Sequence, residues 1–258
     1  MLISDYEAVH RMEGIKRIAE KSAWQMVLQV KEGKITEILA EVGFGPNRKF
    51  KEVMPVEDKD NIIIQGQIDR VDYTQNRFCK VIDYKSGSDS FSRDSVLGGL
   101  KLQLLIYLLA ASQGKGDEEI RPGGAFFFKV GEKISDDPEE MLKYIGKNNK
   151  EMGDSVEEYS YKYKLDGFMI DDGAFKEDLG TVGKIAINSK ERTMEEEIFS
   201  EFLQAGKEKI KEMALALYNG DIRVQPCRRN GIMPCEYCNF RGICYFDKSI
   251  PGCNIRIV

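Results

Sequence analysis

A β-hairpin constrains the fold of this chain more than any other feature of its sequence. Residues 61–73 and 78–84 are two runs rich in apolar and β-branched residues, which is typical of strands. The four residues between them, Thr-Gln-Asn-Arg at 74–77, have the composition of a turn. Because strands joined so closely pair antiparallel, any sheet in this protein is expected to contain this hairpin.

Three charged residues lie on the predicted hairpin. Side chains alternate between the two faces of a strand, so Asp83 and Lys85 point to one face and Ile82 and Tyr84 to the other. The turn between the strands brings Asp69 of the first strand beside Asp83. The sequence therefore predicts two carboxylates and one ammonium group at one place on the sheet.

Two carboxylates and an ammonium group are suited to metal-assisted hydrolysis of a phosphodiester. Mg²⁺ prefers hard oxygen ligands, usually binds through one or two carboxylates, and keeps several waters. A bound metal would polarise the phosphoryl oxygen and acidify the attacking water, while Lys85 would orient that water or neutralise developing charge. An ordinary cross-strand Asp–Lys pair is the alternative for an isolated Asp-x-Lys. The apolar Val-Ile pair before Asp83 and the Ser-Gly pair after Lys85 favour a site at a strand end.

A polar pair on the next predicted helix adds to this site. Residues 95–112 form a leucine-rich helix that stops at Gly114, and Gln103 and Tyr107 lie four residues apart on one of its faces. Satisfied core residues are the alternative reading of this pair when it is taken alone. Together with the hairpin, the pair predicts a single constellation of functional residues.

The remaining pattern predicts an α/β core in which helices cover a mixed sheet. A first helix ends near Gly33, and its buried face is expected to consist of Met12, Ile15, Ala19, Ala23, Met26 and Val30. A long helix opens with the capping-box pair Thr193 and Glu196 and ends at Asn219. Further strands are expected at residues 41–50, 124–130, 161–169 and 181–187.

The charge balance bears on possible partners. The chain has 43 acidic and 38 basic residues, which gives a formal net charge of −5. A free-standing nucleic-acid binder usually has a basic surplus, because phosphate contacts supply most of the affinity. If this chain acts on DNA, we expect weak intrinsic affinity, or a larger assembly that delivers the strand.

The sequence predicts neither a membrane span nor a secretory signal. The apolar stretch 100–111 is shorter than the roughly 18 residues of a span and contains Lys101 and Gln103. A cytoplasmic protein that does not bind a membrane is therefore expected. The chain also lacks a Gly-x-x-x-x-Gly-Lys-[Ser/Thr] phosphate loop, and its single histidine argues against Ser-His-Asp catalysis.

Cysteines near the C-terminus form the second strong signal. Five of the six cysteines lie between positions 227 and 253, and without a secretory signal they are expected to be thiols or metal ligands. Three of them have metal-ligand spacing, x2 and then x5: Cys235, Cys238 and Cys244. Iron–sulfur clusters and structural zinc usually need four ligands, so Cys227 or Cys253 would have to complete the site. A cluster, a zinc site and an empty tail all stay open from the residues alone. The aromatic residues among these cysteines are expected to pack the tail against the core, and a small DNA-contacting patch with the nearby arginines is the alternative: Tyr237, Phe240, Tyr245 and Phe246.

Gly-x-x-Asp at 66–69, Asp-Tyr-Lys at 83–85 and Gln-x-x-x-Tyr at 103–107 resemble the RecB-like branch of the PD-(D/E)xK nucleases. The likeness extends to the C-terminal nuclease domain of AddB-type proteins, which belong to ATP-dependent deoxyribonucleases. It covers most of the chain in the same order, through residues 66–72, 83–87, 100–111, 122–128, 220–221 and 235–247. The implied fold is a restriction-endonuclease-like core, with a central mixed sheet flanked by helices and a cysteine-rich tail.

The resemblance implies a role for each residue of the constellation. The implied metal ligands are Asp69, Asp83 and the Tyr84 backbone carbonyl. Lys85 would be the catalytic lysine. Gln103 and Tyr107 would shape the wall on the DNA side. Glu41, in Glu-Val-Gly-Phe, resembles the upstream glutamate of the family.

For the tail, the resemblance implies a [4Fe-4S] cluster that holds residues 226–258 against a nuclease core of residues 1–225. Its ligands would be a cysteine far upstream together with Cys235, Cys238 and Cys244. No cysteine precedes Cys79 here, and the surroundings of His10 do not match the upstream histidine of related nucleases. AddB-type proteins also have a long helicase-like N-terminal region, so this chain is expected to be a C-terminal fragment with weak activity.

The implied function is a Mg²⁺-dependent (or Mn²⁺-dependent) DNA exonuclease domain of an AddAB-type helicase–nuclease, which resects double-strand breaks for recombinational repair. An AddA-type subunit would help to unwind the duplex and deliver a single strand. One alternative is a small iron–sulfur exonuclease of the CRISPR-associated kind, which shares this order of motifs. Another is an inactive structural or DNA-clamping module, against which the intact Asp69, Asp83 and Lys85 argue.

Overall fold

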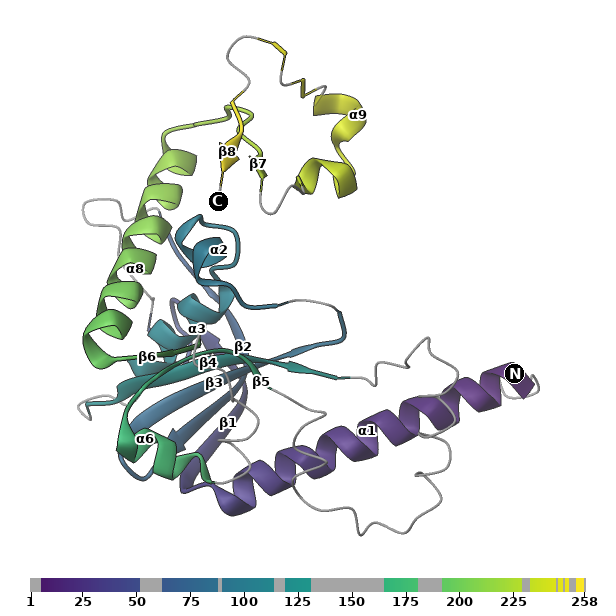
Figure 1. Ribbon diagram of the computed structural model, residues 1–258, viewed down its shortest axis with the longest axis vertical. Helices are drawn as coiled ribbons and strands as arrows, with labels where there is room; N and C mark the ends of the chain where they lie inside the picture. Colours follow the sequence, from purple (N-terminus) through teal and green to yellow (C-terminus); the bar gives the residue numbers. More distant parts are fainter. Residues whose placement is uncertain are drawn as a thin grey trace.

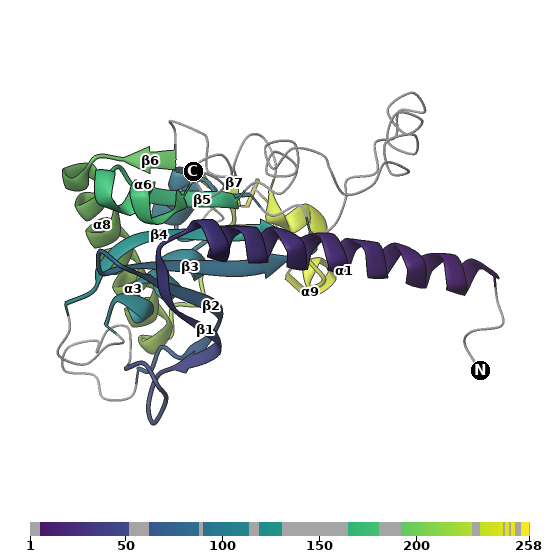
Figure 2. The same cartoon turned by 90° about the horizontal axis from the view of Figure 1, so that it is seen from below.

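The computed structural model shows a mixed six-stranded sheet with helices on both faces (Figures 1 and 2). It describes residues 6–51, 62–87, 90–113, 119–130, 165–180, 192–228, 233–244, 246–247, 249–250 and 254–257. The strands lie side by side in chain order: β1 (Ile35–Phe44), β2 (Gly66–Thr74), β3 (Phe78–Lys85), β4 (Arg121–Lys129), β5 (Leu165–Ile170) and β6 (Thr193–Met194). The predicted α/β core with a central mixed sheet is therefore confirmed.

The sheet contains both antiparallel and parallel pairs of strands. β1, β2 and β3 are antiparallel neighbours, which confirms the predicted hairpin, and β5 is antiparallel to β4. β3 runs parallel to β4, and β5 runs parallel to β6. A parallel pair needs a crossover connection, and α2 (Arg93–Leu97) and α3 (Gln103–Ser112) provide it between β3 and β4.

The two faces of the sheet are covered by different helices. On the face that carries Asp83, the Tyr73 hydroxyl donates a hydrogen bond of 3.1 Å to the carbonyl of Ala111, at the end of α3. On the opposite face, the Tyr84 hydroxyl lies 3.5 Å from the sulfur of Met26 on α1 (Tyr6–Glu32). The long helix α8 (Glu196–Tyr218) packs on α2 and the β5–β6 edge, on the same side as α3 (Figure 1).

Glycines split the helix that was expected over residues 95–112. Gly98 and Gly99 separate α2 from α3, and Gly99 has a φ of 78°, in the left-handed region that glycine tolerates. A Cβ at Gly99 would also lie 2.6 Å from the sulfur of Met213 on α8. The prediction of one helix was therefore wrong. The leucines continue on both sides of the two glycines, but the positive φ of Gly99 and its close contact with Met213 end the helix there.

Other boundaries also differ from the sequence-based expectations. The strand expected at 41–50 begins and ends earlier, as β1, because the chain turns after it at Gly45 (φ 118°) and Asn47 (φ 57°). Thr193 pairs with β5 as part of β6, so α8 begins at Glu196 instead of being capped by Thr193. The expected strand 124–130 is β4 and the expected strand 161–169 is β5, with 161–164 outside the described residues. The strand expected at 181–187 also lies outside them.

Helix α1 does not bury the apolar face expected from its sequence. Met12 and Ile15 are 58% and 67% exposed, in the half of the helix that projects away from the sheet (Figure 1). The buried residues lie in the other half and are largely polar: Ser22, Gln25, Leu28 and Gln29. Only Met26 of the expected face packs against the main core. Among the described helices, none is both long and apolar enough to cross a membrane.

Candidate active site

The hairpin brings Asp69 and Asp83 together at the end of its ladder. Arg70 is paired with Ile82 in the antiparallel register, so Asp69 and Asp83 are the next residues along on the two strands. Beyond this pair, the Tyr84 backbone N–H donates a 2.9 Å hydrogen bond to Asp69 Oδ2 instead of to a strand carbonyl. The Asp69 carboxylate is therefore fixed from β3, the strand that carries Asp83.

Asp83, Lys85 and Gln103 form a closed polar ring over the sheet. Asp83 is only 2% exposed; its Oδ1 accepts a hydrogen bond of 2.9 Å from Gln103 Nε2, and its Oδ2 lies 2.7 Å from Lys85 Nζ. Lys85 Nζ in turn donates to Gln103 Oε1 at 3.1 Å. The predicted alternation of side chains on β3 is confirmed, because Asp83 and Lys85 reach each other on one face. Lys85 is half-buried and so stays accessible to a substrate.

Helix α3 places the polar pair at this ring. Gln103 Nε2 also donates to the Tyr107 hydroxyl at 3.0 Å, so both ends of the Gln103 amide have partners. The ring of Tyr107 meets that of Phe44 edge to face, with centroids 5.9 Å apart. The structure thus brings together the five side chains that the sequence singled out, from three elements: Asp69, Asp83, Lys85, Gln103 and Tyr107.

Glu41 lies on the neighbouring strand, beside Asp69. It stands between Ala40, which pairs with Arg70, and Val42, which pairs with Ile68, and is therefore opposite Asp69. Its φ of 51° is unusual for a residue with a side chain, and such backbone strain is concentrated at functional sites. The Glu41 carboxylate accepts a hydrogen bond of 2.6 Å from the Gln67 side chain.

The oxygen donors of this site fit a hard divalent cation. Asp69 and Asp83 supply two carboxylates from adjacent strands, and Mg²⁺ commonly binds through one or two carboxylates while waters fill its other positions. Within the described ranges, no three His, Cys, Asp or Glu side chains already converge as a closed metal site. His10 lies on α1 and is exposed.

A second charged group lies behind the site, on the opposite face of the hairpin. Asp72 is bonded to Arg70 at 2.6 and 2.8 Å and to Lys80 at 2.9 Å, and all three residues are buried. Burial by itself raises the pKa of Asp72, but the charges of Lys80 and Arg70 hold it below its ordinary value. Burial likewise acts to lower the pKa of Arg70, and Asp72 raises it overall. Sequence reasoning did not single out this group.

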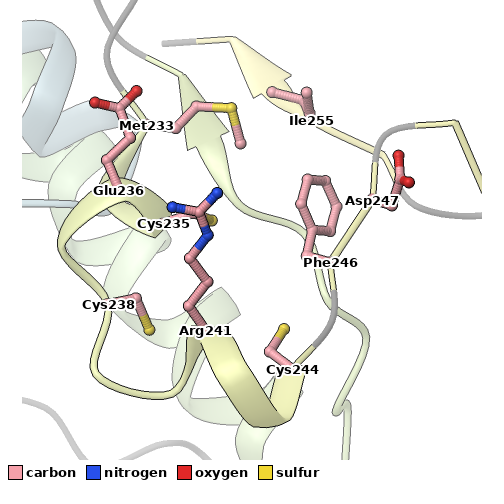
Figure 3. A pocket seen from close by; sticks show the side chains of 9 residues that line it. All are labelled: Met233, Cys235, Glu236, Cys238, Arg241, Cys244, Phe246, Asp247 and Ile255. Atoms are coloured by element: carbon pink, nitrogen blue, oxygen red, sulfur yellow. The ribbon is translucent and has the colours of Figure 1, made fainter.

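The cysteine-rich tail consists of short elements around one pocket. These elements are β7 (Cys227–Arg228), the 3₁₀ helix η2 (Pro234–Tyr237), α9 (Arg241–Cys244) and β8 (Arg256–Ile257). The pocket has a volume of about 310 Å³, and Cys235, Cys238 and Cys244 line it together with Arg241. Figure 3 shows the three cysteines around the Arg241 side chain.

The other cysteines are placed differently. Cys79 is fully buried in β3, and burial raises the pKa of its thiol to about 12, so it is a neutral core residue. Cys227 is buried in β7, and Cys253 lies outside the described residues. Tyr237 and Phe240 are 78% and 69% exposed, so the expectation that the aromatic residues of the tail pack against the core is wrong for these two.

A comparison with known families identifies the class of protein to which this fold belongs. The chain belongs to the PD-(D/E)XK nuclease superfamily, whose family model matches residues 4–245, which is nearly the whole chain. The family that the sequence motifs indicated is therefore confirmed. Nucleases of this superfamily generally use a divalent metal ion.

Curated relatives agree with the narrower likeness to AddB-type proteins. The B subunit of an ATP-dependent helicase/deoxyribonuclease from Alkaliphilus oremlandii is 29% identical, over 96% of this chain and 23% of the relative. Proteins of the same description from Caldanaerobacter subterraneus and Clostridioides difficile are each 31% identical, over 94% and 86% of this chain and 22% and 20% of their own lengths. The chain thus spans about a fifth to a quarter of the length of these relatives.

Proposed function

We propose that this chain is the nuclease domain of an AddAB-type helicase–nuclease and hydrolyses phosphodiester bonds of DNA with Mg²⁺ or Mn²⁺. The observation that carries the proposal is the ring of Asp83, Lys85 and Gln103 beside Asp69, within 3.1 Å at every link of the ring. An ordinary ion pair between two residues of one strand would not need the added amide. This arrangement holds a charged lysine and two carboxylates in one accessible place.

In this proposal, Asp69, Asp83 and the Tyr84 backbone carbonyl would hold the metal, which would supply charge stabilisation at the phosphoryl oxygen and a more acidic attacking water. Lys85 Nζ orients that water or stabilises the charge that develops on the phosphate. Gln103 fixes the positions of Asp83 and Lys85, since its amide bonds to both. Gln103 and Tyr107 form the wall of the site on the DNA side.

The substrate and partners follow from the relatives. Their description names a helicase and a deoxyribonuclease, so we infer that DNA is the substrate and that an AddA-type subunit assists in unwinding. We propose that the chain cuts a delivered single strand exonucleolytically during the processing of double-strand breaks for recombinational repair. The net charge of −5 agrees with this proposal, because phosphate contacts supply most of the affinity for DNA and an acidic chain makes few of them. The supply of a strand by a motor would offset the weak affinity of an acidic chain.

The tail, residues 226–258, is proposed to be a separate structural module beside the nuclease core of residues 1–225. Three thiols line one pocket, and their x2 and x5 spacing is that of three of the four ligands of a [4Fe-4S] cluster or a zinc ion, although within the described ranges they do not converge on one point. Cys235, Cys238 and Cys244 would hold the group, whose contribution would be structural. Phosphodiester hydrolysis requires no change of oxidation state, so no step of the reaction depends on it.

Lys85→Met tests the function directly, because it removes the ammonium group and keeps both carboxylates. A 5′-labelled single-stranded oligonucleotide is incubated with the wild-type chain in Mg²⁺, with the wild-type chain in EDTA, and with the variant in Mg²⁺. We expect cleavage only in the first reaction, with a rate loss in the variant on the order of 100-fold. Cleavage that persists in EDTA, or an unchanged rate in the variant, would rule out this function.

A further inference from the structure

The active-site face of the sheet carries a buried carboxylate besides that of Asp83, Asp166 on β5. In the sheet register Asp83 pairs with Phe127, and Phe127 pairs with Asp166. Asp166 is therefore in the same row as Asp83, two strands away, which corresponds to roughly 10 Å. No role for Asp166 follows from the chemistry described above.

Three donors surround this carboxylate. Arg192 Nη1 lies 2.6 Å from Asp166 Oδ1, Lys129 Nζ lies 3.5 Å from Asp166 Oδ2, and the Phe91 backbone N–H donates to Oδ1 at 3.3 Å. The Asp166 side chain is 8% exposed, whereas those of Lys129 and Arg192 are 39% and 32% exposed. The carboxylate is thus buried beneath two cations that still reach solvent.

Among the described residues, two cations share this one carboxylate, which leaves a positive charge on the face of the sheet. Lys129 is also paired with Lys85 in the β3–β4 register, so the two cations lie next to the proposed catalytic lysine. The Asp72 group likewise has two cations on one carboxylate, but its cations are buried, whereas Lys129 and Arg192 reach solvent. The exposure of both cations and the place of Lys129 in the row favour a binding role.

We propose that Lys129 and Arg192, held by Asp166, bind a backbone phosphate of the DNA strand next to the phosphate that is cut. This inference rests on the proposed nuclease function. Cations that line the path of a strand supply affinity without sequence preference, which a nuclease that digests a delivered strand requires. Asp166 is the positioning residue of this site, because it touches the two cations and not the reacting atoms.

The salt dependence of DNA binding tests this site. Binding of a fluorescent single-stranded oligonucleotide is measured by anisotropy in EDTA, over a range of salt concentrations, for the wild-type chain and for the double variant Lys129→Gln and Arg192→Gln. Each phosphate that is no longer neutralised on a single strand lowers the slope of log affinity against log salt by roughly 0.7, so the double variant, which loses the contacts to one phosphate, should lose roughly 0.7. Lys129→Gln alone should lose part of that, and the charge-retaining pair Lys129→Arg and Arg192→Lys should keep the wild-type slope.

Lys34→Gln combined with Lys176→Gln is the matched control. These two cations are also paired with single carboxylates, Glu177 and Asp171, but lie near the hairpin-turn end of the sheet. The control should keep the wild-type slope. An unchanged slope in the Lys129 and Arg192 variants, or an equal loss in the control, overturns this inference. Cleavage by the wild-type chain is scored separately, so a failure of the nuclease function is distinguished from a failure of this site.

Discussion

The Asp83 carboxylate is only 2% exposed, and its position depends on two hydrogen-bond donors that replace the water molecules it would bind in solvent. Lys85 approaches one oxygen and Gln103 the other, at 2.7 and 2.9 Å. Burying a carboxylate without such partners is costly, because the lost hydration is not replaced. The donors therefore allow a charged group to lie where a metal and a phosphate would meet.

Cys79 and the tail cysteines should differ sharply in reactivity. At pH 8 the Cys79 thiol is neutral and enclosed, because burial raises its pKa to about 12, whereas Cys238 and Cys244 are exposed. In the folded chain after removal of any bound metal with a chelator, iodoacetamide should therefore modify Cys238 and Cys244 and leave Cys79 intact, as measured by mass spectrometry of digested peptides. In urea all three should react. Native Cys79 that reacts as fast as Cys238 would contradict this placement.

Only part of the site can be predicted at the scale of single residues. Asp83 and Lys85 follow from the two-residue period of a strand, and Asp69 follows from the length of the turn. Lys129, Asp166 and Arg192 could not be found in this way, since each meets its partners only after β4, β5 and the segment before β6 come together. A lysine at a strand end is too common to indicate such a site.

At the scale of elements, the β2–β3 hairpin has the metal-binding carboxylates proposed above on one face and a buried ionic group on the other. Asp72 links Arg70 of its own strand to Lys80 of the next, so the group joins the two strands directly behind Asp69 and Asp83. Asp72 and Lys80 are also a paired position in the register. Loss of Asp72 would leave two buried cations without a counter-charge.

Asp72→Asn should therefore destabilise the chain strongly. Removing one partner of a buried ionic group typically costs about 3–5 kcal/mol, because the remaining charge stays buried. Urea unfolding followed by circular dichroism measures this change. Glu20→Gln, which breaks the exposed pair with Lys16, is the control and should leave the unfolding midpoint unchanged. A midpoint for Asp72→Asn equal to that of the wild-type chain would contradict the account of this group.

The same carboxylate gives the stability of the chain a dependence on pH. The folded pKa of Asp72 is lowered from its ordinary value of 3.8, so its contribution is fully present above that value. The contribution is lost as the pH falls through the lower, folded pKa. The wild-type chain should therefore lose stability below about pH 4 by an amount that Asp72→Asn lacks. Urea midpoints of the two proteins, measured between neutral and acidic pH, check this difference.

The type of most helices and strands could be predicted from the sequence, but their first and last residues could be predicted less well. The hairpin, the α8 region and strand β4, with its apolar middle, follow from local patterns. The break at Gly98 and Gly99 could not be read from the leucines around it, because it depends on the approach of Met213 from α8. Likewise Thr193 has the sequence of a cap, but pairing with β5 draws it into the sheet.

At the scale of the whole molecule, exposed apolar side chains occur on several elements, and two parts of the chain are examples. One is the projecting half of α1, with Met12 and Ile15, and the other is the tail, with Tyr237, Phe240 and Ile243. The α/β class was predictable from the order of strands and helices. The buried face of α1 was not, because its packed half buries polar residues such as Gln25 and Gln29.

The central claim is that Asp83 belongs to a site that cuts DNA. The most direct test compares the rate of Mg²⁺-dependent cleavage of a single-stranded oligonucleotide by the wild-type chain and by Asp83→Ala, with equal folding verified by circular dichroism. We predict a loss on the order of 100-fold or more, since the variant lacks both a carboxylate for the metal and the partner of Lys85 and Gln103. Equal rates in the two proteins would contradict the account.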